Sequence, residues 1–241
     1  MKKLSYWLVP VFLIHLNSIY ACGGGPRPWE GTESRAWNDS DNWNTNCGGG
    51  VPGATESAAI SGSVTNLPIV STEESIGSIR FIENGSLTVS EGGAFTVNYS
   101  LYSSDDTQGK VYIKDGGEVT VVESLSSIGE VVYELSNGSK LTGAGQAEGA
   151  KAIINTLASG NGNTVTISSE GSIQKITSLN LDDQFIFSGN VNVIEGMSLA
   201  GSLKLNSTLF GDLLLNGGHL SGTGILDGNL TMNGGTVSPG N

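Results

Sequence analysis

Residues 85–97, GSLTVSEGGAFTV, are followed 24 positions later by GKVYIKDGGEVTV at residues 109–121. Both stretches fit G-x-x-x-x-x-x-G-G-x-x-T-V, and apolar residues alternate with polar ones on each side of the glycine pair. Such alternation is typical of a strand that is buried on one side. A repeated unit of strand, glycine corner and strand predicts one coil of a β-solenoid, because a coil buries its apolar side only by stacking on another.

Further copies of this unit occur later in the chain. GEVVYELSNGSKLT begins at Gly129, 20 residues after the second copy, and LLLNGGHLSG at 213–222 precedes LTMNGGTVSPG at 230–240 by 17 residues. A period near 20 stacks like residues in parallel strands about 4.8 Å apart, so residues 51–241 would form roughly eight to ten coils. The inward positions are expected to be Leu87, Val89, Phe95, Val97, Val111, Ile113, Val119, Val121, Leu230, Met232 and Val237.

The composition also favours an all-β fold. Glycine accounts for 36 of 241 residues without a period of three, and charged residues make up 14%, which suits strands with Ser, Thr and Asn on their outer side. GQAEGAKAIINTLAS at 145–159 is the one stretch with a helical pattern, which its glycines weaken. A β-sandwich of short strands is the alternative fold, and the repeat favours the solenoid.

The first segment has the order of a secretory signal peptide, with Lys2 and Lys3 before an apolar run and a small residue at Ala21. We assign residues 1–21 to it and residues 22–50 to an irregular Trp-rich N-terminal segment. Cys22 and Cys47 are the only cysteines, and in an exported chain they predict one disulfide. Lipidation of Cys22 and two free thiols are the alternatives.

The N-terminal segment contains three of the four tryptophans, Trp29, Trp37 and Trp43. Such large aromatic groups are expected to cover the open end of the solenoid, and an aromatic carbohydrate platform is the alternative. Asp39 and Asp41 alternate as in a calcium loop, but Trp43 and the absence of the loop glycine favour turn hydrogen bonds, so no metal ligand is assigned.

No catalytic or cofactor-binding residue is assigned. The net charge of −12 disfavours nucleic acid as a partner, since phosphate neutralisation needs Lys and Arg. The adjacent acids Asp105-Asp106 and Asp182-Asp183 are expected to be solvated turn residues. His219, the only histidine after the signal segment, has no nearby acid or nucleophile and is expected at a corner or on the surface.

Two stretches resemble a known family. WNDSDNWN with VPGATESAAI, within residues 37–60, resembles the opening of secreted bacterial β-helical passenger proteins, with Glu56 where that family usually has Asp. GTGILDGNLTMNGGTVSPGN at 222–241 resembles the passenger region of autotransporters. The resemblance implies export, a right-handed parallel β-helix, display on the bacterial outer surface, and a C-terminal outer-membrane barrel.

This chain contains no segment with the pattern of that barrel, so the passenger is expected to be an N-terminal fragment, incomplete at its C-terminus. The expected function is that of a non-enzymatic stalk or adhesin, secreted or displayed at the cell surface, with a host-surface or glycan ligand. A secreted carbohydrate-active β-helix, either a polysaccharide lyase or a glycan-binding module, is the alternative.

Overall fold

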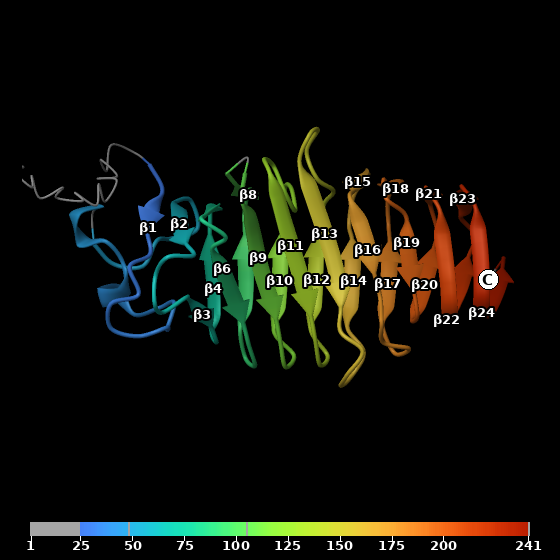
Figure 1. Ribbon diagram of the computed structural model, residues 1–241, viewed down its shortest axis with the longest axis horizontal. Helices are drawn as coiled ribbons and strands as arrows, with labels where there is room; N and C mark the ends of the chain where they lie inside the picture. Colours follow the sequence, from blue (N-terminus) through green and yellow to red (C-terminus); the bar gives the residue numbers. More distant parts are fainter. Residues whose placement is uncertain (1–24, 48, 105, 241) are drawn as a thin grey trace, which may run out of the picture.

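The computed structural model describes residues 25–47, 49–104 and 106–240, and the signal segment and Cys22 lie outside these residues. The chain is 52% strand and forms a parallel β-solenoid of about nine turns. Figure 1 shows the coils stacked in sequence order along one long axis, with the N-terminal segment at one end. The predicted parallel β-helix is confirmed, and every pairing between two named strands is parallel, as a sandwich of antiparallel sheets would not be.

Each coil contributes strands to as many as three faces. Face 1 contains β3 (Ile69–Val70), β6 (Ser86–Val89), β9 (Gln108–Ile113), β11 (Glu130–Leu135), β13 (Lys151–Thr156), β16 (Lys175–Thr177) and β19 (Met197–Leu199). Face 2 contains β4 (Glu73–Ile76), β7 (Ala94–Val97), β10 (Glu118–Val121), β12 (Lys140–Gly143), β14 (Thr164–Ile167), β17 (Gln184–Phe187) and β20 (Ser202–Leu205). The long strands β22 (Leu213–Gly222) and β24 (Leu230–Pro239) bend across the corner between faces 1 and 2.

Face 3 is interrupted. Its first block is β1 (Arg27–Pro28), β2 (Ser57–Ser61), β5 (Ser78–Ile82) and β8 (Leu101–Ser103), and its second is β15 (Gly171–Ile173), β18 (Val191–Val193), β21 (Thr208–Phe210) and β23 (Ile225–Asp227). Between the blocks, the coils that carry β11 and β13 have no face 3 strand. Irregular segments at residues 122–129 and 144–150 run there instead.

The pairing register confirms two of the three predicted offsets. Ala94 pairs with Glu118, an offset of 24, and Leu213 pairs with Leu230, an offset of 17. The third prediction was wrong by two residues, because Val111 pairs with Tyr133, which gives 22 and not 20. An even shift leaves the alternation of inward and outward residues unchanged, so hydrophobic pattern alone does not distinguish the two registers.

The corner after each face 1 strand decides between those registers. Asp115 and Asn137 both have left-handed backbones, with φ of 53° and 54°, and each is followed by a glycine at φ near 80°. Asn137 Nδ2 donates to Asp115 Oδ1 at 2.8 Å, and Gly116 N donates to Asn137 O at 3.0 Å. Only the offset of 22 stacks these two corners.

The interior of the solenoid is a continuous column of aliphatic and phenyl side chains. The inward positions predicted in the first two copies are all buried. Residues 145–159 form no helix, and Lys151–Thr156 is strand β13, with Ala152 and Ile154 inward. Leu230, Met232 and Val237 stack in register on the buried Leu213, Leu215 and Leu220, but they are about 40–46% exposed because no described coil covers their other side.

The three tryptophans cover the N-terminal end of this column. Trp29, Trp37 and Trp43 are at most 2% exposed, and their rings meet edge to face at 4.7–5.0 Å for the two pairs that include Trp43. Trp37 also packs on Phe95, with ring centroids 4.9 Å apart. The prediction that they cap the solenoid is confirmed. Buried rings offer no surface to a sugar, so the aromatic platform is excluded for these three side chains.

The cap also continues the strand pairing. Strand β1 pairs with β2, and Trp37 N donates to Ile69 O on the first face 1 strand at 2.9 Å. Glu56 joins the cap to the first coil, since its carboxylate binds Arg27 and accepts from Gly53 N at 2.7 Å. The acid that follows the Val-Pro-Gly turn therefore has a structural role.

The helical content is small. It comprises the short 3-10 turns η1 (Ser40–Asn42) and η2 (Thr45–Cys47), both in the cap. Within the described ranges, no helix combines the length and the hydrophobicity needed to cross a membrane.

Candidate functional groove

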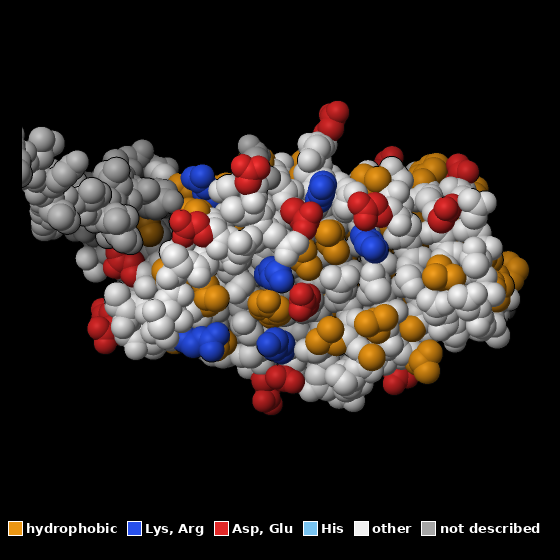
Figure 2. All heavy atoms as spheres, in the orientation of Figure 1, with side chains coloured by type: hydrophobic (Ala, Val, Ile, Leu, Met, Phe, Trp, Pro, Cys, Tyr) orange, Lys and Arg blue, Asp and Glu red, His pale blue; other side chains and the backbone are white. Residues whose placement is uncertain are grey.

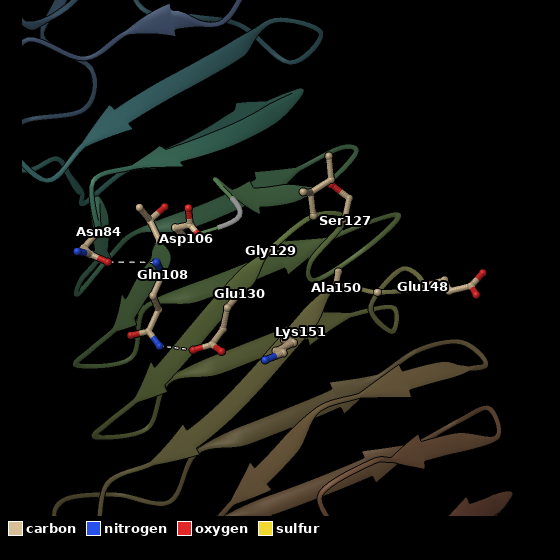
Figure 3. A pocket seen from close by; sticks show the side chains of 12 residues that line it. Asn84, Asp106, Gln108, Ser127, Gly129, Glu130, Glu148, Ala150 and Lys151 are labelled. Carbon is tan, nitrogen blue, oxygen red and sulfur yellow. Dashed lines mark hydrogen bonds between the residues drawn. The ribbon is translucent and has the colours of Figure 1, made fainter.

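A groove of about 600 Å³ lies where face 3 is interrupted. It follows the corner before face 1 across four successive coils, from Asn84 ahead of β6 to Lys151 at the start of β13. Figure 3 shows the side chains that line it, which come from the starts of neighbouring strands and the loops before them. The long axis of the groove is therefore parallel to the axis of the solenoid.

The floor of the groove is a row of polar residues in register. Gln108 pairs with Glu130, and Glu130 pairs with Lys151, so these three side chains occupy equivalent positions on β9, β11 and β13. Gln108 Nε2 donates to Glu130 Oε1, and Asn84 Oδ1 accepts from Gln108 N at 3.1 Å. Asp106 lies at the same end of the groove as Gln108, whereas Glu148 points away from the row (Figure 3).

The row leaves hydrogen-bonding capacity unused. Among the described residues, neither Glu130 Oε2, Gln108 Oε1 nor Lys151 Nζ has a partner. The contrast is with Glu118 and Lys140 on face 2, which are also register neighbours and whose charged atoms are 2.5 Å apart. In the groove Glu130 is bound by Gln108, and the acceptor and the donor remain open to solvent or ligand.

The backbone of the groove walls is already hydrogen-bonded. Ser127 N donates to Leu101 O at 2.9 Å, Ser103 N donates to Ile128 O at 3.1 Å, and Ala147 N donates to Ser126 O at 2.8 Å. Beneath this wall the buried Tyr133 hydroxyl donates to Leu125 O at 2.6 Å. Burial raises the pKa of the Tyr133 phenol well above its usual value, so it remains a neutral donor. The groove is thus a fixed feature of the solenoid.

Charge in the groove is mainly negative. Asp106, Glu130 and Glu148 contribute three carboxylates against the single ammonium of Lys151, and no aromatic residue lines the groove. Figure 2 shows that acidic and basic side chains are intermixed over the middle coils, whereas hydrophobic ones gather towards the C-terminal coils and their loops. The groove can offer hydrogen bonds to hydroxyl groups and repels anions.

No family model, curated protein or solved structure matches the chain. The function must therefore be argued from the geometry and from the residues themselves.

The acidic pair at 182–183 was predicted wrongly in one half. Asp182 is exposed, but Asp183 is fully buried at the corner between faces 1 and 2. Its Oδ1 accepts from the backbone and side-chain N–H groups of Asn163, both at 2.9 Å, and its Oδ2 accepts from Ser178 Oγ at 2.8 Å and from Thr156 Oγ1. Four donors replace water around this carboxylate, which makes it part of the fold.

The other candidate residues have ordinary structural surroundings. Asp39 begins η1, accepting from Asp41 N at 3.2 Å and from Ser34 Oγ at 2.8 Å, as turn chemistry predicts. His219 lies on the outer side of face 2, with Nδ1 2.7 Å from Thr236 Oγ1. None of the described residues forms a group of three or more His, Cys, Asp or Glu side chains that could hold a metal.

The remaining predictions concern residues outside the described ranges. Cys47 lies in η2, and no described cysteine is free, but Cys22 is not described, so the Cys22–Cys47 disulfide stays a prediction. Asp105 is likewise outside, while Asp106 is exposed at the groove. The sequence did not predict the groove. Its signal was the loss of the alternating pattern at 122–129 and 144–150, which marks the missing strands.

Proposed function

We propose that this chain is the β-helical passenger of an autotransporter-like protein, displayed at the bacterial cell surface as a stalk or adhesin. The observation that carries the proposal is the unbroken register of coils from β2 to β24, which makes a stiff support with polar side chains outward. The sequence resemblance at residues 37–60 and 222–241 adds to it, and Glu56 gives the acid of the first motif a role in joining the cap to the coils.

Binding without catalysis fits the way that the groove is built. Its floor is a row of side chains on rigid strands, and its one floor carboxylate is held by Gln108. Such a surface can bind a ligand along the solenoid axis while the coils hold it away from the cell.

The experiment places the chain and its activity separately. Antibody labelling and protease treatment of intact source cells should find the solenoid outside the cell. Purified protein should bind cells or glycans without shortening a polysaccharide. Protein found only inside intact cells, or release of new reducing ends or unsaturated sugars, would overturn the proposal.

A second candidate is a carbohydrate-active β-helix. It is favoured by the presence of Asp106, Glu130 and Glu148 in one groove, since glycoside hydrolysis uses paired carboxylates. The depolymerisation assay separates this candidate from the first one, and loss of product in Glu130→Gln would assign the groove as its active site.

A further inference from the structure

We infer that the groove binds an extended, uncharged oligosaccharide that lies along the solenoid axis over Gln108, Glu130 and Lys151. The inference rests on the proposed binding function and names both the site and the chemical class of the ligand. It follows from three properties of the groove: its direction, its unpaired polar groups and its charge.

The direction of the groove selects a linear ligand. Its lining residues come from four successive coils, and three strand intervals of about 4.8 Å make a length of about 14 Å. Within this length the same kind of position recurs once per coil, on β9, β11 and β13. A chain of a few linked sugars meets such a row with one unit after another, whereas a single small molecule would use only a part of it.

The unpaired groups select hydroxyls. Glu130 Oε2 and Gln108 Oε1 accept hydrogen bonds and Lys151 Nζ donates them, and none of the three has a partner among the described residues. A sugar hydroxyl both donates and accepts, so neighbouring hydroxyls on one ring can satisfy Glu130 and Lys151 together. Hydrogen bonds to charged groups are the stronger kind, which gives this pair most of the discrimination.

The charge and the backbone exclude the main alternatives. Three carboxylates against one ammonium disfavour a phosphate, a sulfated glycan or a uronic acid chain. A peptide that adds a strand needs open backbone groups, but those of Leu101, Ser103 and Ser127 are already bonded. An apolar ligand would leave the polar row unsatisfied.

The test uses the full chain and ligand-observed NMR with defined oligosaccharides. Neutral linear chains built on glucose, mannose, galactose or N-acetylglucosamine are compared with oligogalacturonate as the anionic chain. We expect at least one neutral chain to bind and oligogalacturonate to bind at least tenfold more weakly. Glu130→Gln and Lys151→Met should each weaken the neutral chain about tenfold, the loss expected for one hydrogen bond to a charged group.

The matched controls are Glu118→Gln and Lys140→Met on face 2. They make the same changes of charge at another pair of register neighbours and should leave binding unchanged. Thermal unfolding of all four variants confirms that they are folded.

Three outcomes overturn the inference: no neutral chain binds, the anionic chain binds better, or the groove and control variants behave alike. If the protein binds a glycan but the groove variants do not affect it, the inference fails while the proposed function stands. If the wild type cleaves the oligosaccharide, the proposed function fails.

Discussion

Asp183 is the residue whose environment departs most from what its sequence neighbours suggest. A buried carboxylate is tolerated when donors replace its water, and Asp183 has four. The loops that reach this corner, at residues 157–163 and 178–183, bring those donors from two adjacent coils. Asn163 extends the arrangement by accepting from Ser139 N at 3.1 Å, so a column of polar side chains supports the widest corners of the solenoid.

Replacing Asp183 tests this role. Asp183→Ala leaves the buried N–H and hydroxyl donors of Asn163, Ser178 and Thr156 unsatisfied, and we expect the free energy of unfolding to fall by about 3 kcal/mol or more. Asp182→Ala is the matched control on the exposed neighbour and should change it by about 0.5 kcal/mol at most. Urea denaturation followed by circular dichroism measures both, and equal effects would contradict the structural role.

Tyr133 gives the fold a dependence on alkaline pH. Burial raises its pKa in the folded state, so between the unfolded value near 10 and the raised value the unfolded chain binds fewer protons. The stability contributed by the neutral phenol is therefore complete below about pH 10 and is lost as the pH rises above it. Unfolding titrations from pH 8 to pH 11 should show a steeper alkaline loss for wild type than for Tyr133→Phe.

The exposed Tyr99 provides the comparison for this experiment. Its side chain is 43% exposed, so Tyr99→Phe should keep the alkaline loss of the wild type. At neutral pH, Tyr133→Phe should also cost about 1 kcal/mol, because Leu125 O loses its buried donor. If the two variants have the same pH profile, Tyr133 is not the group that titrates.

At the scale of the strand and its corner, the backbones of successive coils approach too closely for most side chains. Gly218 follows the bend in β22, and a Cβ atom built there would lie 1.9 Å from Gly201 O of the coil beneath. The equivalent positions in earlier coils include Ser139, Asn163 and Asp183, where longer loops make room for a side chain. The coil length falls along the chain from 24 to 17 residues as these loops shorten.

Gly218→Ala should therefore be strongly destabilising. The new methyl group would displace the backbone of an adjacent coil, and we expect a loss of at least about 2 kcal/mol in the free energy of unfolding. Gly53→Ala is the control, because its Cβ would meet only Glu56 Oε2 at 3.7 Å. Chemical denaturation of both variants tests this, and a Gly218 variant as stable as wild type would show that the corner can widen.

These corners also explain which elements the sequence could predict. The 24-residue and 17-residue offsets were found because both strands and the glycine corner repeat together. The 22-residue offset was missed because alternation tolerates a shift of two, and the left-handed backbones of Asp115 and Asn137 have no equally simple pattern. The burial of Asp183 and the groove both depend on loops from neighbouring coils, which local sequence does not reveal.

At the scale of the whole molecule, a solenoid is a linear array in which each coil contacts only its neighbours. Its stability is therefore distributed along the axis, and the two ends of the described chain differ. The N-terminal end is covered by buried tryptophans that continue the strand pairing, so opening from that end first requires the cap to detach.

Removing one tryptophan should make this linear organisation visible. Trp43→Ala deletes a fully buried ring between Trp29 and Trp37, and the loss of about 3–5 kcal/mol falls on the cap and the first coil. In hydrogen exchange followed by mass spectrometry, we expect faster exchange in β2, β3 and β4 and unchanged exchange in β17 and β20. Phe187→Ala, a comparable cavity in a later coil, should produce the reverse pattern. Because nearest-neighbour coupling is what localises each effect, equal acceleration in every coil for both variants would mean that the solenoid unfolds as one cooperative unit.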